Sequence, residues 1–188
     1  MAAPGDTKVR RAVYADLERV PDTMVAEIVD GELFASPRPR PRHAVAASVL
    51  GSDLNPPFQQ GRGGPGGWWI LFEPELHFGE DVLVPDIAGW RRERLPAPPA
   101  VAHLALAPDW LCEVLSPSTE AVDRAKKLKI YAREGVSHVW LIDPLLRTLE
   151  VLRLESQRWA LIAMREKHAL VRAEPFDAIE LELGALWE

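Results

Sequence analysis

A short apolar run at residues 110–115, Trp-Leu-Cys-Glu-Val-Leu, is closed by Ser-Pro and predicts a strand that is buried on both faces. Side chains alternate between the two faces of a strand, so Leu111, Glu113 and Leu115 share one face. Glu113 therefore points into an otherwise aliphatic layer. An ionised carboxylate there needs a cation, a metal ion or several hydrogen-bond donors, because it would otherwise take up a proton. A structural ion pair with an arginine and a functional site both meet this need.

A second buried strand is predicted at residues 82–90, where Asp86 directly follows Pro85. Proline removes a hydrogen-bond donor from the ladder, which favours a bulge or a strand edge at this point. If the two strands are neighbours in a sheet, the carboxylates of Asp86 and Glu113 converge. Such hard oxygen ligands suit Mg2+ or Mn2+. Two acids alone, however, do not define a site.

Residues 118–135 have the pattern of a helix. Ser116 or Ser118 is placed to cap it, acidic residues fall early, basic residues fall late, and Gly135 supplies a left-handed end. At helical spacing, one face of this segment is mostly aliphatic and is expected to be buried. Its members are Val122, Ala125, Leu128 and Ala132.

Lys127 lies on the flank of this expected face, beside Tyr131, and Lys126 points elsewhere. From there Lys127 can lean over the sheet edge toward Glu113, with Asp123 one turn earlier as an ion-pair partner. The alternative is a solvated lysine in an ordinary i, i+4 pair with Asp123.

The remaining pattern predicts one α/β domain with a mixed central β-sheet flanked by helices, over residues 1–188, with residues 1–10 as a flexible tail. Residues 136–143 form a strand parallel to the Glu113 strand, because a helix crosses between them. This unit places the site at the carboxyl-end crevice of the sheet. Other elements are expected at residues 13–20 and 43–54 (helices), 24–34 and 147–165 (hairpins), and 179–183 (an edge strand).

The residues discussed above belong to a larger set that combines several residue types at fixed spacing. The set comprises Val-Pro-Asp-Ile at 84–87, Pro-Asp at 108–109, Glu-Val-Leu-Ser-Pro-Ser-Thr at 113–119, Asp123, Lys127, Tyr131, Gly-Val at 135–136 and Trp-Leu-Ile-Asp-Pro at 140–144. From about Tyr14 to Asp143 the chain resembles the Uma-two family of putative restriction endonucleases, in the PD-(D/E)xK nuclease superfamily. The usual superfamily pattern has a lysine two residues after the second acid, where this chain has Leu115. The resemblance implies that Lys127, on the following helix, takes that place.

The resemblance implies a restriction-endonuclease-like fold and a Mg2+-dependent or Mn2+-dependent endonuclease that hydrolyses phosphodiester bonds in DNA. Asp86 and Glu113, with the carbonyl of Val114, would hold one divalent ion. Lys127 would neutralise developing charge or position the attacking water. Glu27 matches the early acid of the family and would orient water at the metal, support Lys127, or simply be solvated.

The most basic short segment alternates proline with arginine at residues 36–43, which predicts a stiff extended loop. Its side chains contact the phosphate backbone of DNA or remain solvated, and the pattern fits both. His43, at the entrance to a helix, resembles a histidine of the family and would contact substrate or cap the helix. One of Glu73 and Glu75 would also reach the site, and strand parity does not choose between them. The arginines of the segment are Arg38, Arg40 and Arg42.

The composition adds little to the functional interpretation. The net charge of −6 does not indicate a nucleic-acid binder, so positive charge would have to be gathered locally. The single Cys112 excludes an internal disulfide, and neither a signal peptide nor a membrane span is evident, so we expect a cytoplasmic protein without membrane contact. The C-terminal strands complete the sheet or form a homodimer surface. The rival functions are a non-catalytic module that binds nucleic acid or protein, and a hydrolase of another phosphoester.

Overall fold

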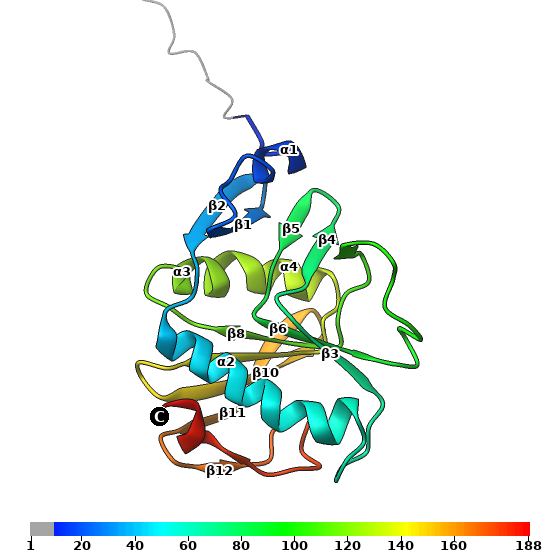
Figure 1. Cartoon of the computed structure of the whole chain (residues 1–188), viewed down its shortest axis with the longest axis vertical. Helices are drawn as coiled ribbons and strands as arrows, with labels where there is room; N and C mark the ends of the chain where they lie inside the picture. The colour runs from blue at the N-terminus through cyan, green and yellow to red at the C-terminus, as the bar shows by residue number, and fades with distance from the viewer. Residues whose placement is uncertain (1–9) are drawn as a thin grey trace, which may run out of the picture.

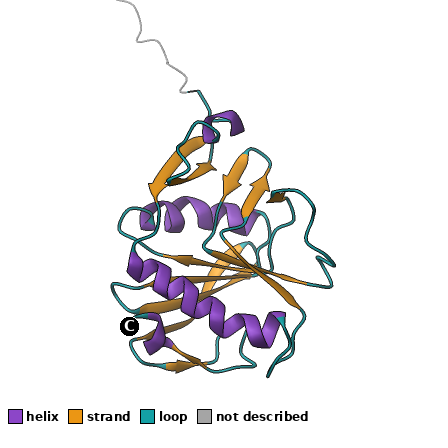
Figure 2. Ribbon diagram, in the orientation of Figure 1, coloured by secondary structure: helices purple, strands orange, loops and turns teal. Residues whose placement is uncertain are grey.

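The computed structural model of the protein describes residues 10–188 and contains two main β-sheets, with helices on both sides of the larger one (Figures 1 and 2). The tail expected at residues 1–10 lies, except for Arg10, outside the described residues. The larger sheet has six strands in the order β11-β10-β9-β8-β6-β3. Its strands are β3 (Trp68–Phe72), β6 (Ile87–Arg91), β8 (Trp110–Val114), β9 (His138–Asp143), β10 (Thr148–Glu155) and β11 (Arg158–Glu166).

The larger sheet is mixed, as the sequence predicts. β8 and β9 are parallel, and the other neighbouring pairs are antiparallel. β6 lies beside β8, with Ile87 opposite Cys112, so the strand that Asp86 precedes and the strand that carries Glu113 are neighbours. The C-terminal hairpin of β10 and β11 completes this sheet, and β11 forms its edge.

The smaller sheet has five strands in the order β2-β1-β5-β4-β7. The hairpin of β1 and β2 is the predicted one, and its turn at Asp30 and Gly31 uses positive φ at both residues (56° and 79°), which suits a tight hairpin. The strands are β1 (Met24–Val29), β2 (Glu32–Pro37), β4 (Glu75–Phe78), β5 (Asp81–Leu83) and β7 (His103–Leu104).

Two long helical segments cover the larger sheet from opposite sides (Figure 1). One is α2 (Pro41–Leu54), which continues into a π-helical turn, η1 (Asn55–Gln59). The other joins α3 (Glu120–Val122), a π-helical turn η2 (Asp123–Lys127) and α4 (Leu128–Arg133), and it lies between the larger sheet and the β1–β2 hairpin. The remaining short elements are α1 (Tyr14–Leu17), β12 (Leu170–Val171), β13 (Leu181–Glu182) and the 3-10 turn η3 (Leu183–Leu186).

The two faces of β8 border two different cores, as strand parity predicts. Trp110, Cys112 and Val114 pack in the core that contains α2. Leu111 and Leu115 pack in the core that contains α4 and the smaller sheet. Burial raises the pKa of the Cys112 thiol well above its usual range, which fits the expected role as a small buried hydrophobe.

Two apolar segments, one of them the strand predicted at residues 82–90, are divided between the two sheets. Residues 82–90 become β5 in the smaller sheet and β6 in the larger one, and the chain crosses at Pro85 and Asp86. Residues 68–78 divide in the same way into β3 and β4, with Glu73 at a positive φ of 44°. Prolines at 74 and 85 explain both breaks, because neither can donate to a ladder. Residues 181–182 likewise pair with β12 in a separate two-stranded sheet and do not extend the large one.

The helical segment after β8 forms, and the expected aliphatic face is confirmed in part: Val122 and Leu128 pack against the core that contains α4, and Ala132 is buried, but Ala125 does not belong to it. Ala125 is exposed, whereas Asp123 and Lys127 are buried together with Tyr131. The π-helical turn accompanies this shift, because it adds a residue to one turn and rotates the following side chains. Nor does a serine side chain cap the segment: its N-cap is Thr119, without a side-chain capping bond. Ionic side chains therefore direct this helix against the sheets in place of a purely apolar stripe.

Within residues 10–188, no helix combines the length and apolar character that crossing a membrane would require.

Candidate active site

A cavity of about 420 Å³ lies where the two sheets meet. Chain segments from both sheets, from the loop before α2 and from η2 contribute to its wall, so residues far apart in the sequence face one another there. Its ionisable lining residues are Glu27, Arg38, Arg40, His43, Glu73, Asp86, Glu113, Asp123 and Lys127.

Asp86 is placed at this cavity by the crossing of the chain between the sheets. Its Oδ2 accepts a hydrogen bond of 2.7 Å from the backbone N–H of Val114 on β8, which fixes one side of the carboxylate. Its Oδ1 lies 3.2 Å from Nε2 of His43. The proline before Asp86 thus marks the point at which the carboxylate leaves the sheet and enters the cavity, one residue before β6 begins.

Lys127 is 2% exposed and is surrounded by carboxylates. Its Nζ lies 2.9 Å from Glu27 Oε1, 2.9 Å from Glu113 Oε1 and 3.2 Å from Asp123 Oδ1. Three acceptors match the three N–H donors of an ammonium group. Burial alone would lower the pKa of Lys127, but Glu113 and Glu27 hold it well above its usual range. The lysine is therefore charged and held in one position.

Glu113 is 3% exposed, and its Oε1 also accepts a hydrogen bond of 2.6 Å from the hydroxyl of Tyr131. Burial raises the pKa of Glu113 well above its usual range, Lys127 lowers it, and Asp123 and Asp86 raise it further. Burial also raises the pKa of Tyr131 well above its usual range, so its hydroxyl stays a donor. The sequence places Tyr131 on this flank but gives no sign of its bond to Glu113.

The donor set around the cavity fits a divalent cation. Three carboxylates, those of Glu27, Glu113 and Asp123, share one buried lysine, and a fourth, that of Asp86, lies in the same cavity against His43, so the acids outnumber the basic groups that pair with them. A cation among these oxygens would reverse the rise in the pKa of Glu113. Oxygen-only ligands favour hard ions such as Mg2+ and Mn2+.

His43 faces the same carboxylates. Burial lowers the pKa of His43, but Asp86 and the backbone of Val114 raise it by more, so it lies above its ordinary value. Nδ1 of His43 is buried without a hydrogen-bond partner among residues 10–188. His43 does not cap α2, whose N-cap is Arg40 without a side-chain capping bond. The position of His43 in the cavity therefore agrees with contact to a substrate and does not agree with capping of the helix.

The arginines of the basic segment divide between the cavity and its surroundings. Arg38 and Arg40 line the cavity, and Arg38 is paired with Glu73 at 3.4 Å. Arg42 is exposed on the first turn of α2 and is not a lining residue. The sequence does not decide whether Glu73 or Glu75 reaches the site. In the structure Glu73 lines this cavity and Glu75 does not.

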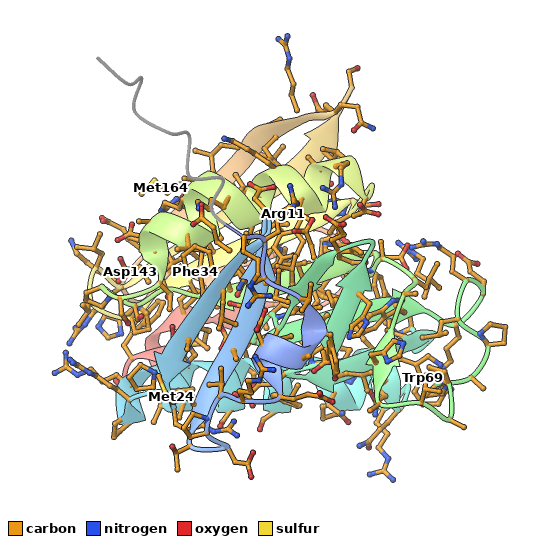
Figure 3. All side chains as sticks on the ribbon, turned by 90° about the horizontal axis from the view of Figure 1, so that it is seen from above. Arg11, Met24, Phe34, Trp69, Asp143 and Met164 are labelled. Atoms are coloured by element: carbon orange, nitrogen blue, oxygen red, sulfur yellow. The ribbon has the colours of Figure 1, made fainter. Side chains whose placement is uncertain are left out.

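Lys126, the neighbour of Lys127, points away from the cavity. Its Nζ lies 2.6 Å from Glu32 Oε2 and 4.9 Å from the centre of the Phe34 ring. Figure 3 shows Phe34 on the hairpin strand beside the helix. The two lysines thus have adjacent positions in the chain and different environments, as helical geometry predicts.

Comparisons with known proteins agree with this architecture. The model of the Uma2 family, described as "Putative restriction endonuclease", matches residues 6–184. A crystal structure of a "putative nuclease belonging to DUF820" from Anabaena variabilis superposes with a TM-score of 0.74 and 25% sequence identity, covering 94% of this chain and 97% of the other. No match was found among curated proteins.

The buried ion cluster should contribute to the free energy of unfolding. Lys127→Met should lower the free energy of unfolding by about 3–5 kcal/mol, because it leaves buried carboxylates without a counter-charge. Lys126→Met should change it by less than about 1 kcal/mol, since its pair with Glu32 is largely exposed. Urea denaturation of both variants, followed by circular dichroism, measures the difference.

The pH dependence of the stability loss in Lys127→Met tests whether unpaired carboxylates cause it. The pKa of Glu113 is already raised in the folded state and rises further without the lysine, so the loss in Lys127→Met should shrink as the pH is lowered and the carboxylates protonate. Equal losses in the two lysine variants, or a loss in Lys127→Met that grows on acidification, would contradict the arrangement of charges described above.

Proposed function

The chain belongs to the Uma2 family of putative restriction endonucleases, and on this premise we propose that it is a metal-dependent nuclease that hydrolyses phosphodiester bonds in DNA. The observation that carries the proposal is the group of three carboxylates around one buried lysine, which shares a cavity with the carboxylate of Asp86. A purely structural cluster of this composition would leave buried negative charge unpaired, which is costly.

The proposed metal ligands are the carboxylates of Asp86 and Glu113 and the carbonyl of Val114, and the ion is Mg2+ or Mn2+. When bound, such an ion polarises a phosphoryl oxygen and makes water more acidic. The protein contributes the fixed orientation of its ligands. The N–H of Val114 holds Asp86, and the hydroxyl of Tyr131 holds Glu113.

Lys127 supplies a positive charge beside the proposed metal ligands. Glu27 and Asp123 hold its ammonium group 2.9 Å from Glu113, so no reorganisation is needed when negative charge develops on the phosphate. Glu27 is itself fixed, because its Oε1 accepts a 2.7 Å bond from the backbone N–H of Val84. In this scheme Glu27 positions the lysine and need not contact the substrate.

Arg38 and Arg40 would bind the DNA backbone at the rim of the cavity. The pair of Arg38 with Glu73 is exposed and therefore weak, so a phosphate can replace the carboxylate. Positive side chains at the rim would offset the negative interior and the overall charge of −6. Arg42, on the outer side of α2, would add a contact only to DNA that extends beyond the cavity.

The second candidate function is a non-catalytic module that binds nucleic acid or protein and keeps the nuclease fold. Leu115, at the position where the superfamily pattern has its lysine, favours this alternative. The side chain of Leu115 is 3% exposed and packs in a core. Position 115 therefore supplies no basic group to the site. Cleavage assays separate the two functions.

The first prediction concerns metal binding. Because the carboxylates repel one another, Mn2+ or Mg2+ should stabilise the folded protein, by about 2.7 kcal/mol at an ion concentration of 100 times Kd. The melting temperature should therefore rise with either ion in the wild type and respond little in Asp86→Asn and Glu113→Gln. A wild-type melting temperature that is indifferent to millimolar Mn2+ would exclude the metal site.

The second prediction concerns catalysis. Lys127→Met should reduce cleavage by about 10²–10³-fold, the cost of removing one preorganised charge-stabilising group, while Lys126→Met should cleave like the wild type. The assay uses plasmid, linear, branched and single-stranded DNA with Mg2+, Mn2+ or EDTA. Retention of the metal-induced rise in melting temperature shows that Lys127→Met is folded. If the wild type binds metal and DNA but cleaves none of these substrates, the non-catalytic alternative holds.

The third prediction concerns the basic segment. Replacing Arg38, Arg40 and Arg42 together by alanine should reduce the slope of log affinity against log salt by about 2–3 units, since each phosphate contact contributes about 0.9. Arg158→Ala, at the far edge of the larger sheet, is the control and should leave the slope unchanged. Fluorescence anisotropy with a labelled duplex in Ca2+ or EDTA measures binding without cleavage. An unchanged slope in the triple variant would mean that these arginines are solvated and do not contact DNA.

A further inference from the structure

A second group of potential metal ligands lies in the smaller sheet, outside the proposed active site. It consists of Glu75 and His77 on β4 and His103 on β7. Glu75 and His77 are two residues apart and so share a face, and Glu75 lies opposite His103 in the parallel pair of strands. One ligand atom from each of the three side chains lies within 4.8 Å of the others.

The three side chains are already in close contact. Nε2 of His77 lies 2.7 Å from Oε1 of Glu75, and the imidazole rings of His77 and His103 stack at 4.0 Å with an angle of 11° between their planes. All three are half-buried, with His77 24% and Glu75 31% exposed, so solvent ions can reach them. The backbone register of two strands thus holds two imidazoles and one carboxylate together.

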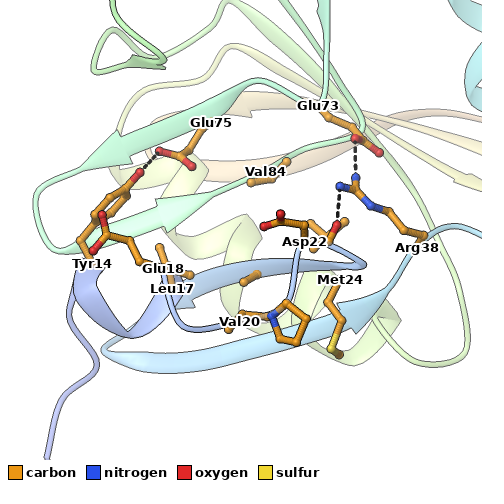
Figure 4. A pocket seen from close by; sticks show the side chains of 13 residues that line it. Tyr14, Leu17, Glu18, Val20, Asp22, Met24, Arg38, Glu73, Glu75 and Val84 are labelled. Carbon is orange, nitrogen blue, oxygen red and sulfur yellow. Dashed lines mark hydrogen bonds and ion pairs between the residues drawn. The ribbon is translucent and has the colours of Figure 1, made fainter.

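Tyr14 on α1 orients the carboxylate from outside the group. Its hydroxyl donates a 3.1 Å bond to Oε1 of Glu75 (Figure 4). Its ring lies 5.2 Å from that of His77. Donors of this kind commonly fix ligating carboxylates in metal sites.

We propose that Glu75, His77 and His103 form a second metal site, specific for a borderline transition-metal ion such as Zn2+, with Tyr14 as a positioning residue. Two imidazoles and a carboxylate suit Zn2+, Ni2+ or Cu2+, whereas the oxygen ligands of the proposed active site suit Mg2+ or Mn2+. Three protein ligands leave a fourth position open for water or another group.

The location of the site indicates its effect. Tyr14 and Glu75 line a second cavity, of about 430 Å³, which shares Arg38 and Glu73 with the wall of the active-site cavity (Figure 4). A bound ion would join β4 to β7 and, through Tyr14, to the segment that begins the described chain. It would stabilise the smaller sheet without taking part in the nuclease reaction.

The test is a titration of metal-free protein with Co2+ or Zn2+ in excess Mg2+, followed by the visible spectrum of Co2+ and by calorimetry. One ion should bind per chain to the wild type, and affinity should fall by more than tenfold in His77→Ala and His103→Ala. Tyr14→Phe should lose about tenfold, as expected for an outer hydrogen-bond donor. His168→Ala, which removes an exposed histidine elsewhere, should bind like the wild type.

Two further variants separate this site from the proposed active site. Asp86→Asn and Glu113→Gln should keep the Co2+ spectrum and the Zn2+ affinity, even though they lose the response to Mn2+. His103→Gln, which preserves volume, is compared with His103→Ala so that a folding defect is not mistaken for ligand loss. The proposal is overturned if the wild type binds no Co2+ or Zn2+ in excess Mg2+, if both His103 variants bind normally, or if binding disappears in Glu113→Gln.

Discussion

The ammonium group of Lys127 is the interaction on which the centre of this protein depends. It lies among Glu27, Glu113 and Asp123, which come from the smaller sheet, the larger sheet and the helical segment between them. Removing the lysine costs several kcal/mol, because the carboxylates would remain buried without a counter-charge. The three parts of the fold therefore meet at one ammonium group, whose three N–H donors all have acceptors only when every part is in place.

The division of the chain between two sheets brings these groups together. The turns at Pro74 and Pro85 each move the chain from one sheet to the other, and Asp86 stands at the second crossing. β8 then supplies Glu113 beside it, since β6 and β8 are paired. A single continuous sheet would keep the carboxylate of Glu27 away from the acids of β6 and β8. The break in the strands is thus what permits a cavity with acids on several sides.

The sequence predicts much of this arrangement, and the errors have physical causes. Strand parity around Glu113 and the hairpin at Asp30 and Gly31 depend on local periodicity and turn chemistry, and both are confirmed. The place of Ala125 in the aliphatic stripe is wrong, because the pairing of Lys127 with distant acids and a π-helical turn outweigh apolar spacing. The positions of His43, Tyr131 and the cluster at Glu75 depend on contacts across elements, which one sequence without register does not specify.

Glu27 also anchors the β1–β2 hairpin to the rest of the molecule. β1 has a single paired position with β5, Ile28 opposite Val82, and next to it Glu27 bonds to the N–H of Val84 and to Lys127. The hairpin is held further by the bond from the N–H of Asp30 to Asp81, by the pair of Glu32 with Lys126, and by the packing of Val29 and Phe34 in the core that contains α4. A local opening of the hairpin would withdraw the carboxylate of Glu27 from the lysine, so the integrity of the charge cluster is coupled to the local stability of this hairpin.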